Sequence, residues 1–191
     1  MMQLPERFRT PRLLLTRIGP DDLKDLVCLH RQAQVAAGLG CAPADEEIVT
    51  QLEHLAGQWE QHRFGWWAVR DPGSGRFIGR GGLRPLTPEI SAEAELGCAL
   101  LPEYWNRGLA TELAKVSVAQ GFVRLHLEQV VGFTLPSNSR ARRIMEKTGL
   151  RLDGSTAHAG AQRALYRLTA ASWRVGTSRT HERPPEELVA G

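Results

Sequence analysis

The chain has 191 residues and a mass of 21.1 kDa, a length that predicts one domain with a substantial core. Its formal net charge of +3 is too small to indicate nucleic-acid binding by itself. No apolar run approaches the ~18 residues of a membrane span, and the N-terminal segment contains no apolar stretch typical of a signal peptide. Three cysteines without CxxC spacing fit a reducing compartment, so we expect a cytoplasmic protein with no membrane partner.

Hydrophobic periodicity in the first half of the chain predicts both strands and helices. The apolar run RLLLTRI is typical of a strand that is buried on both faces. Pro20, followed by two aspartates, is typical of the first turn of a helix. The turn formers DPGSG connect two neighbouring strands. We expect strands at 12–18, 64–71, 76–86 and 92–101, and helices at 19–34 and 46–63.

The second half of the chain alternates strands and helices and closes with two strands. Leu109, Leu113, Val116 and Val123 share one side of a helix, and Gly149 is placed to end the next helix. The expected strands are 128–135, 150–154 and 163–169, and the expected helices are 108–125 and 137–149. This order indicates a mixed α/β (α+β) fold in a single domain over residues 1–176. The polar, proline-bearing residues 177–191 are expected to form a mobile tail.

Several common functional motifs are absent from the sequence. It contains no GxxxxGK[ST] loop and no GxSxG elbow, and GRGGLR fails GxGxxG because Arg84 stands in place of the last glycine. The six histidines show no HxxxH or HExxH spacing, so we expect no metal site. Their default interpretation is a surface or packing role.

The segment PEYWNRGLATEL places unusual residues between a strand and a helix. The first turn of a helix carries unpaired backbone N–H groups and the positive end of the helix dipole. Gly108 allows a ligand to approach the backbone closely, Ala110 keeps the next turn small, and Arg107 adds a positive charge. Together these residues predict a cradle for an anion such as a phosphate. The alternative is a glycine that the strand–helix junction merely tolerates.

A second helix start, in PSNSRARRIMEKTG, is also polar and positively charged. Asn138 is placed to cap the helix. Arg140, Arg142 and Arg143 follow in its first turns, although three arginines also fit a solvated face. Two consecutive strand–helix units of this kind favour one large phosphate-bearing ligand.

These segments resemble the GNAT superfamily of acetyl-coenzyme A-dependent N-acetyltransferases. More narrowly, they resemble its branch of ribosomal-protein N-terminal acetyltransferases (RimJ/RimL-type) and their relatives. The resemblance rests on TPRLLLTRIGPDDL, ELGCALLPEYWNRGLATEL and PSNSRARRIMEKTGLRLDG, which occur in the family's order and spacing. It implies a GNAT-like domain with a mostly antiparallel, splayed sheet of about seven strands, flanked by about four helices.

The resemblance implies that the glycine-bearing loop binds the pyrophosphate of acetyl-coenzyme A through backbone N–H groups. Trp105 stands where the family usually has Gln or Arg, a departure that is common in the ribosomal-type branch. Asn138 matches an asparagine that hydrogen-bonds the coenzyme arm, and Ala141 replaces a serine often found three residues later. The implied coenzyme-binding residues are Leu100, Leu101, Asn106, Arg107, Gly108, Leu109, Ala110, Thr111, Asn138 and Arg142.

The implied reaction is direct transfer of an acetyl group from the thioester to a primary amine. A base must first remove a proton, because an alkylammonium with a pKa of about 10.4 is mostly protonated at neutral pH. Glu95 matches a strand carboxylate that the family often uses as this base, and Glu93, two residues earlier on the same strand face, is the second candidate. An N–H of the strand near Cys98 is a candidate to stabilise the thioester oxygen. Met145 occupies the position of the tyrosine that many members use as general acid.

The sequence leaves the acceptor open. A protein N-terminus, an aminoglycoside-like antibiotic, a polyamine and an amino acid all remain candidates, because residues 31–50 and 153–162 carry no recognisable motif. Trp66, Trp67 and Trp105 are either core aromatics or part of an acceptor groove. The alternative function is a catalytically silent acyl-coenzyme A-binding sensor or interaction module, and nucleic-acid binding is the weakest candidate. Similar proteins often form homodimers.

Overall fold

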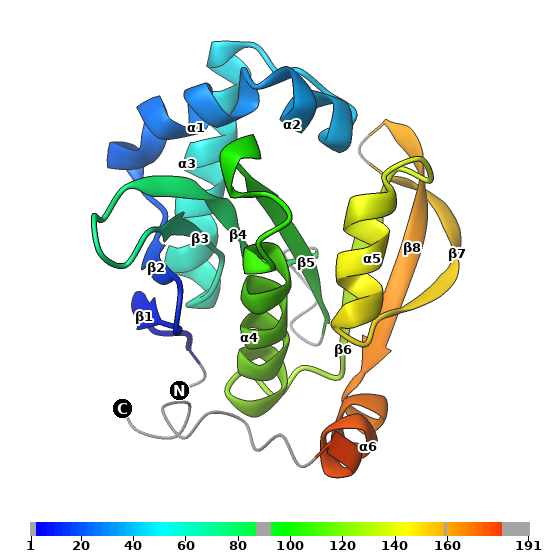
Figure 1. Ribbon diagram of the computed structural model, residues 1–191. Coiled ribbons are helices and arrows are strands. Elements are labelled where there is room, and N and C mark those ends of the chain that lie inside the picture. Colours follow the sequence, from blue (N-terminus) through cyan, green and yellow to red (C-terminus); the bar gives the residue numbers. More distant parts are fainter. Residues whose placement is uncertain (1–2, 87–92, 159, 181–191) are drawn as a thin grey trace.

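The computed structural model describes residues 3–86, 93–158 and 160–180. In this part of the chain, eight strands form one sheet in the order β1-β2-β3-β4-β5-β6-β8-β7 (Figure 1). The strands are β1 (Arg7–Arg9), β2 (Leu14–Arg17), β3 (Trp66–Arg70), β4 (Phe77–Pro85), β5 (Glu93–Leu100), β6 (Gln129–Thr134), β7 (Arg151–His158) and β8 (Ala161–Thr169). This mixed α/β architecture confirms the expected fold class, and the strand count is close to the expected seven.

One junction in the sheet differs from the others, because β5 and β6 are parallel whereas all other neighbouring strands are antiparallel. Only residues Glu93 to Glu95 of β5 pair with β6. Beyond Glu95 the two strands diverge, as Figure 1 shows above the lower end of β6. The expected splayed, mostly antiparallel sheet is therefore confirmed, and it opens in its middle.

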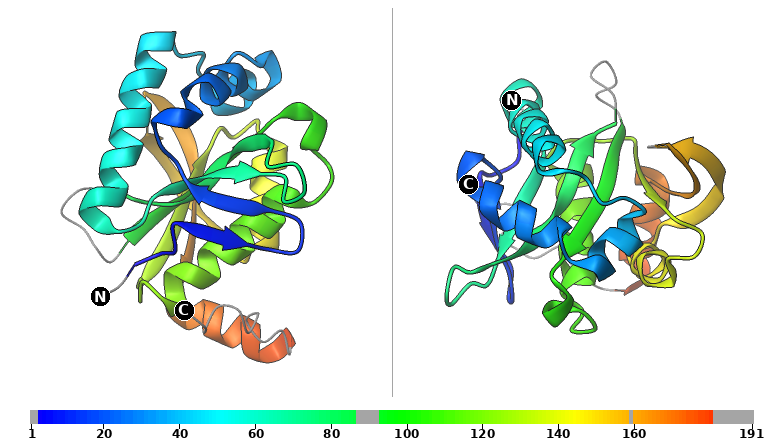
Figure 2. Two further views of the ribbon diagram at one scale, coloured as in Figure 1. Left: turned by 90° about the vertical axis from the view of Figure 1, so that its left-hand side faces the viewer. Right: turned by 90° about the horizontal axis from the view of Figure 1, so that it is seen from above.

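Helices cover both faces of the sheet. Figure 2 shows α3 on one side of the strands and α4 on the other. Helix α1 packs with α3, and α5 packs beside α4. The α-helices are α1 (Leu23–His30), α2 (Ala33–Leu39), α3 (Asp45–His62), α4 (Leu109–Val123), α5 (Ser139–Lys147) and α6 (Ala170–Thr180), and two short 3-10 helices span Pro20–Asp22 and Pro102–Tyr104.

Apolar side chains on both faces of the sheet form the core. Trp67 and Leu83 on the inner strands are fully buried, and so is Leu113 on α4. Trp67 also donates a hydrogen bond from its indole N–H to the carbonyl of Pro5, which ties the N-terminal segment to β3. Helix α4 is buried along most of its length, so the start of this helix is held firmly against β4 and β5.

The structure differs from the sequence expectations at several element ends. The helix expected at 19–34 is interrupted at Gln32, whose backbone is extended, so α2 is a separate helix. Strand β1 was not expected, and β7 continues well past residue 154. Helix α6 includes the first four residues of the expected tail, while residues 181–191 lie outside the described residues. None of the described helices is long and apolar enough to cross a membrane.

Candidate active site

Two adjoining cavities lie where β5 and β6 diverge, and each is named after a helix or a residue that lines it. The α4 cavity, about 470 Å³, opens at the start of α4. The Glu95 cavity, about 450 Å³, lies beside the paired end of β5. Both are lined by Cys98, so the two cavities meet at the middle of β5. The residues they share are Gly38, Leu39, Cys98, Asn138, Ala141 and Ile144.

The α4 cavity contains most of the residues expected to hold the coenzyme. The loop before α4 and the first turn of the helix line it together with the end of β5. Because α4 begins at Leu109, the backbone N–H groups of its first turn have no partner within the helix. The expected residues that line this cavity are Leu100, Asn106, Gly108, Leu109, Ala110, Thr111 and Asn138.

Gly108 has a backbone conformation that favours glycine. Its φ angle is +76°, in the left-handed region, and it caps the N-terminus of α4. A side chain at this position would be strained and would lie 3.4 Å from Nη2 of Arg12. The backbone conformation at the start of α4 therefore favours glycine at position 108.

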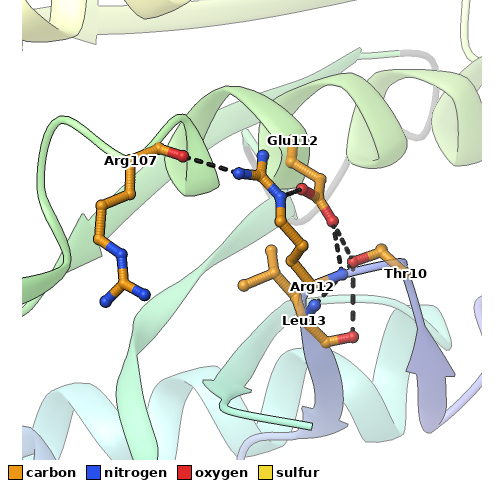
Figure 3. A network of polar contacts seen from close by, with 5 residues as sticks. All are labelled: Thr10, Arg12, Leu13, Arg107 and Glu112. Carbon is orange, nitrogen blue, oxygen red and sulfur yellow. Dashed lines mark hydrogen bonds and ion pairs between the residues drawn. The ribbon is translucent and has the colours of Figure 1, made fainter.

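A polar network from the N-terminal segment holds this loop in place (Figure 3). Arg12 donates from Nη1 to the carbonyl of Arg107 at 2.8 Å, and from Nε to Glu112 at 2.6 Å. Thr10 donates to the other oxygen of Glu112, also at 2.6 Å. Arg12 therefore fixes the carbonyl beside Gly108 and neutralises a carboxylate in the first turn of α4.

Trp105 has a structural role at the same junction. Its indole N–H donates a hydrogen bond of 2.7 Å to the carbonyl of Leu100, at the end of β5. The guanidinium of Arg140 lies over the indole, 4.6 Å from the ring centroid. Trp105 thus links the end of β5 to the start of α5, while Trp67 belongs to the core.

Three residues expected at the coenzyme do not line the α4 cavity. The exposed side chain of Arg107 lies over Tyr104, 5.5 Å from its ring centroid. Leu101 is buried in the core. Arg142 donates from Nε to the hydroxyl of Tyr166 at 3.0 Å. The positive charges that do line this cavity come from Arg140, Arg143 and Lys147 of α5.

Asn138 caps α5, and both polar atoms of its side chain already make hydrogen bonds within the protein. Its Oδ1 accepts from the N–H of Ala141 at 3.1 Å, and its Nδ2 donates to the carbonyl of Gly38 at 2.9 Å. Asn138 therefore joins α5 to the end of α2, at the point where both cavities meet.

The Glu95 cavity is built on the face of the sheet that α1 and α3 cover. Because side chains alternate along a strand, Glu95 and Gly97 of β5 point to this face, as do Arg80 and Arg84 of β4. Glu95 is only 7% exposed, and its Oε2 accepts two hydrogen bonds from Arg84, at 2.6 and 3.0 Å. The expected base is thus a buried, ion-paired carboxylate that lines a cavity.

His158 approaches Glu95 from the opposite side of the gap. Its Nε2 lies 3.7 Å from Oε2 of Glu95, and its ring stacks on Phe133 with 3.9 Å between centroids. Burial lowers the pKa of His158 below its ordinary value of 6.5; the charge of Glu95 opposes this shift, and Arg84 adds to it. The imidazole is therefore mostly neutral at neutral pH and can accept a proton.

Other candidates for proton transfer are placed away from the gap or are already engaged. Glu93 accepts a hydrogen bond from the side chain of Gln129 and is not among the described residues that line either cavity. Met145 lines the Glu95 cavity and offers no hydroxyl. The hydroxyl of Tyr166 is held between Arg142 and Glu146.

Sequence reasoning missed three charged or titratable residues that line the Glu95 cavity, Arg80, Arg84 and His158. Trp66, for which an acceptor groove was one of two expected locations, lines the same cavity. The sequence held one usable signal: Arg80 and Arg84, four residues apart on an expected strand, had to share a face. His158 gave no such signal, because it follows a short strand pattern and reaches Glu95 only through the fold.

Comparisons with known proteins bear on the family of the chain. The family model described as "Acetyltransferase (GNAT) domain" matches residues 12–151. An uncharacterized N-acetyltransferase of Bacillus subtilis, YoaA, is 24% identical over 149 residues, which are 77% of this chain and 84% of that protein. Spermidine N(1)-acetyltransferase of Escherichia coli is 31% identical over 120 residues, which are 59% of this chain and 61% of that protein.

Solved structures share the fold at low sequence identity. An acetyltransferase from Agrobacterium tumefaciens has a TM-score of 0.76 and 24% identity, covering 88% of this chain and 96% of that one. Ribosomal-protein-S5-alanine acetyltransferase from Vibrio fischeri has a TM-score of 0.71 and 15% identity, covering 87% of this chain and 98% of that one. The latter likeness concerns the fold alone, so it does not assign this chain to the ribosomal-type branch. The family model, which matches well over half of the residues, does show that the chain belongs to the GNAT acetyltransferase family and is an N-acetyltransferase.

Proposed function

We propose that the protein transfers an acetyl group directly from acetyl-coenzyme A to a primary amine of a small molecule or a protein N-terminus. The observation that carries this proposal is the gap between β5 and β6. It joins the start of α4 on one side to a buried carboxylate on the other, through cavities that meet at Cys98. We further propose the ribosomal-type branch as the subgroup, on the strength of Trp105 and its bond to the end of β5.

The α4 cavity fits the phosphate-bearing part of the coenzyme. The N–H groups of the first turn of α4 provide donors for a pyrophosphate, and Gly108 allows close approach. Arg140, Arg143 and Lys147 add positive charge at the same cavity. Of the expected coenzyme residues, Arg107 and Arg142 would act mainly through the backbone or through α5, because their side chains face elsewhere.

The edge of β5 beyond Glu95 fits the thioester-bearing arm. Since β6 pairs only up to Glu95, the following residues of β5 present their backbone edge to the gap. An extended amide-containing arm can pair with such an edge, as a peptide adds to a sheet. An N–H near Cys98 is then placed to donate to the thioester oxygen as negative charge develops there.

The residues around the Glu95 cavity provide the base. The acceptor ammonium loses one proton to the Glu95–His158 pair, and the resulting neutral amine attacks the thioester carbon. A C–N bond forms and the C–S bond breaks, so the thiolate leaves with the electron pair, and the nitrogen releases its second proton to solvent to give the neutral amide. We propose His158 as the first proton acceptor, because Glu95 is already ion-paired with Arg84, whereas His158 is a neutral imidazole at neutral pH. Glu95 then stabilises the imidazolium.

The departing thiolate has no tyrosine to protonate it. The chain has two tyrosines, and Tyr166 is held between two side chains while Tyr104 lines only the α4 cavity. The proton therefore comes from solvent or from the imidazolium of His158. The same feature favours the second candidate function, a catalytically silent acyl-coenzyme A-binding module.

One experiment separates the two functions. Purified protein is incubated with acetyl-coenzyme A and a panel of amino acids, polyamines, aminoglycosides and short peptides, and free thiol is measured. We expect amine-dependent thiol release. Titration calorimetry on the wild type and on Gly108→Glu gives the binding control. Binding without thiol release for any amine would indicate the silent module, and the absence of binding at millimolar ligand would overturn both functions.

A further inference from the structure

Three side chains that line the Glu95 cavity carry polar atoms for which the described part of the chain provides no hydrogen-bond partner. They are both ring nitrogens of His30, Nε1 of Trp66 and Nε of Arg80. The three residues are 3%, 5% and 3% exposed. A buried polar atom without a partner loses its hydrogen bonds to water on folding and gains none in return, which is destabilising. Since all three side chains line one cavity, a ligand or water that enters it can supply the missing partners.

The charge of Arg80 is the least satisfied of these groups. Arg84 is paired with Glu95, whereas within the described residues Arg80 has no carboxylate partner. Both guanidinium groups lie over Trp66, 4.2 Å and 4.6 Å from its ring centroid. Stacking on an indole offsets only part of the cost of burying a charge. Burial, followed by the charge of Arg84, lowers the pKa of Arg80 to about 10, so Arg80 remains charged at neutral pH.

We infer that Arg80, Trp66 and His30 bind an anionic group of the acceptor, and that the acceptor is a small primary amine bearing a carboxylate, as in an amino acid. This inference rests on the acetyl transfer proposed above. A carboxylate only accepts hydrogen bonds, and each of the three residues offers an N–H donor. Arg80 and Arg84 share Trp66, so the anion site lies beside Glu95, where the amine must lose its proton.

The same charges disfavour a polyamine. The charged residues that line the cavity are three arginines, Arg80, Arg84 and Arg163, and two carboxylates, Glu47 and Glu95. The arginines outnumber the carboxylates, so a second ammonium group of the acceptor would enter a cavity with an excess of positive charge. Burial lowers the pKa of His30 to about 4, so this residue is neutral at neutral pH and adds no positive charge. The cavity is therefore matched to an amine whose remaining part is anionic, in contrast to spermidine.

Matched acceptor pairs test this inference. Acetylation of free amino acids is compared with acetylation of the corresponding amides, which keep the amine and lose the carboxylate. Glycine, β-alanine and 4-aminobutyrate vary the spacing, aminomethylphosphonate tests a phosphonate, and peptides with an acidic or neutral second residue test a protein N-terminus. We expect kcat/KM to be roughly 10- to 100-fold higher for the carboxylate member of a pair. Equal rates, or a preference for spermidine, would overturn the inference.

The variant Arg80→Met removes the charge and keeps most of the apolar stem. We expect it to abolish the preference within each pair, while Arg151→Met, which alters an exposed arginine of β7, preserves it. Because the substitution removes a buried charge without a carboxylate partner, the melting temperature should stay at or above that of the wild type. A lower melting temperature with an unchanged preference would mean that Arg80 is structural. An equal loss of rate for amides and acids would place Arg80 at the thioester.

A binding measurement keeps the inference independent of turnover. The complex with coenzyme A is titrated with an N-acetylamino acid and with its amide, and the quenching of tryptophan fluorescence is followed. We expect tighter binding of the acid, lost in Arg80→Met. If the acid and its amide bind equally, the anion site is excluded even when acetyl transfer is observed. If the acid binds selectively but no amine is acetylated, the proposed transfer fails and the anion site stands.

Discussion

At the scale of single residues, the Glu95–His158 pair is the centre of the reaction that we propose. The carboxylate comes from β5 and the imidazole from β7, and they meet across the gap at 3.7 Å. Burial lowers the pKa of His158, and Glu95 acts in the opposite direction. The imidazole of His158 can therefore accept a proton at neutral pH. Its protonation should lower the rate on the acidic side of the pH–rate profile.

The pH dependence of kcat/KM identifies which member of the pair accepts the proton. Wild-type activity should fall as the pH drops below 6.5, because His158 becomes protonated there. His158→Gln should remove this acidic limb and lower turnover by about 100-fold. Glu95→Gln should move the limb to lower pH, because it removes the charge that raises the pKa of His158, and it should weaken coenzyme binding far less than it lowers turnover.

The exposed residue His126 provides a control, since His126→Gln should leave the profile unchanged. If the acidic limb persists in His158→Gln and disappears in Glu95→Gln, the carboxylate alone is the base. If turnover of Glu95→Gln equals that of the wild type, Glu95 takes no part in the reaction.

At the scale of elements, the start of α4 depends on a segment about a hundred residues away in sequence. Arg12 follows β1 and binds both the carbonyl of Arg107 and the carboxylate of Glu112 (Figure 3). Without this cation, the negative charge of Glu112 in the first turn of α4 would repel an anion that binds there. Arg12 is thus a positioning residue for the anion cradle, although it does not line either cavity.

The variant Arg12→Gln should raise the dissociation constant of acetyl-coenzyme A by about 10-fold, since it removes an ion pair and a charge-assisted hydrogen bond that hold the loop. Calorimetry measures this constant. Arg9→Gln is the matched control, because Arg9 lies in the same segment and binds the carbonyl of Pro72 instead. An unchanged dissociation constant in Arg12→Gln would show that the loop holds its shape without the network.

At the scale of the whole molecule, the sequence predicted the local parts of the fold better than the long-range ones. The order of strands and helices and the Gly108 loop could be predicted, because turn residues and hydrophobic periodicity depend on neighbouring residues in the sequence. The split between α1 and α2 was not, since Gln32 is extended without a glycine or proline to mark it. The neighbourhood of His158, Glu95 and Arg80 was equally unreadable, because it forms only when β4, β5 and β7 are brought around one gap.

The central claim is that acetyl-coenzyme A binds in the gap between β5 and β6, and amide hydrogen exchange tests it most directly. Exchange is compared with and without saturating acetyl-coenzyme A. We expect increased protection at 97–101, 107–111 and 138–141, which line or border the α4 cavity, and none in β1 or at 151–157. Protection confined to other segments, or no change at all under saturating ligand, would contradict this placement of the coenzyme.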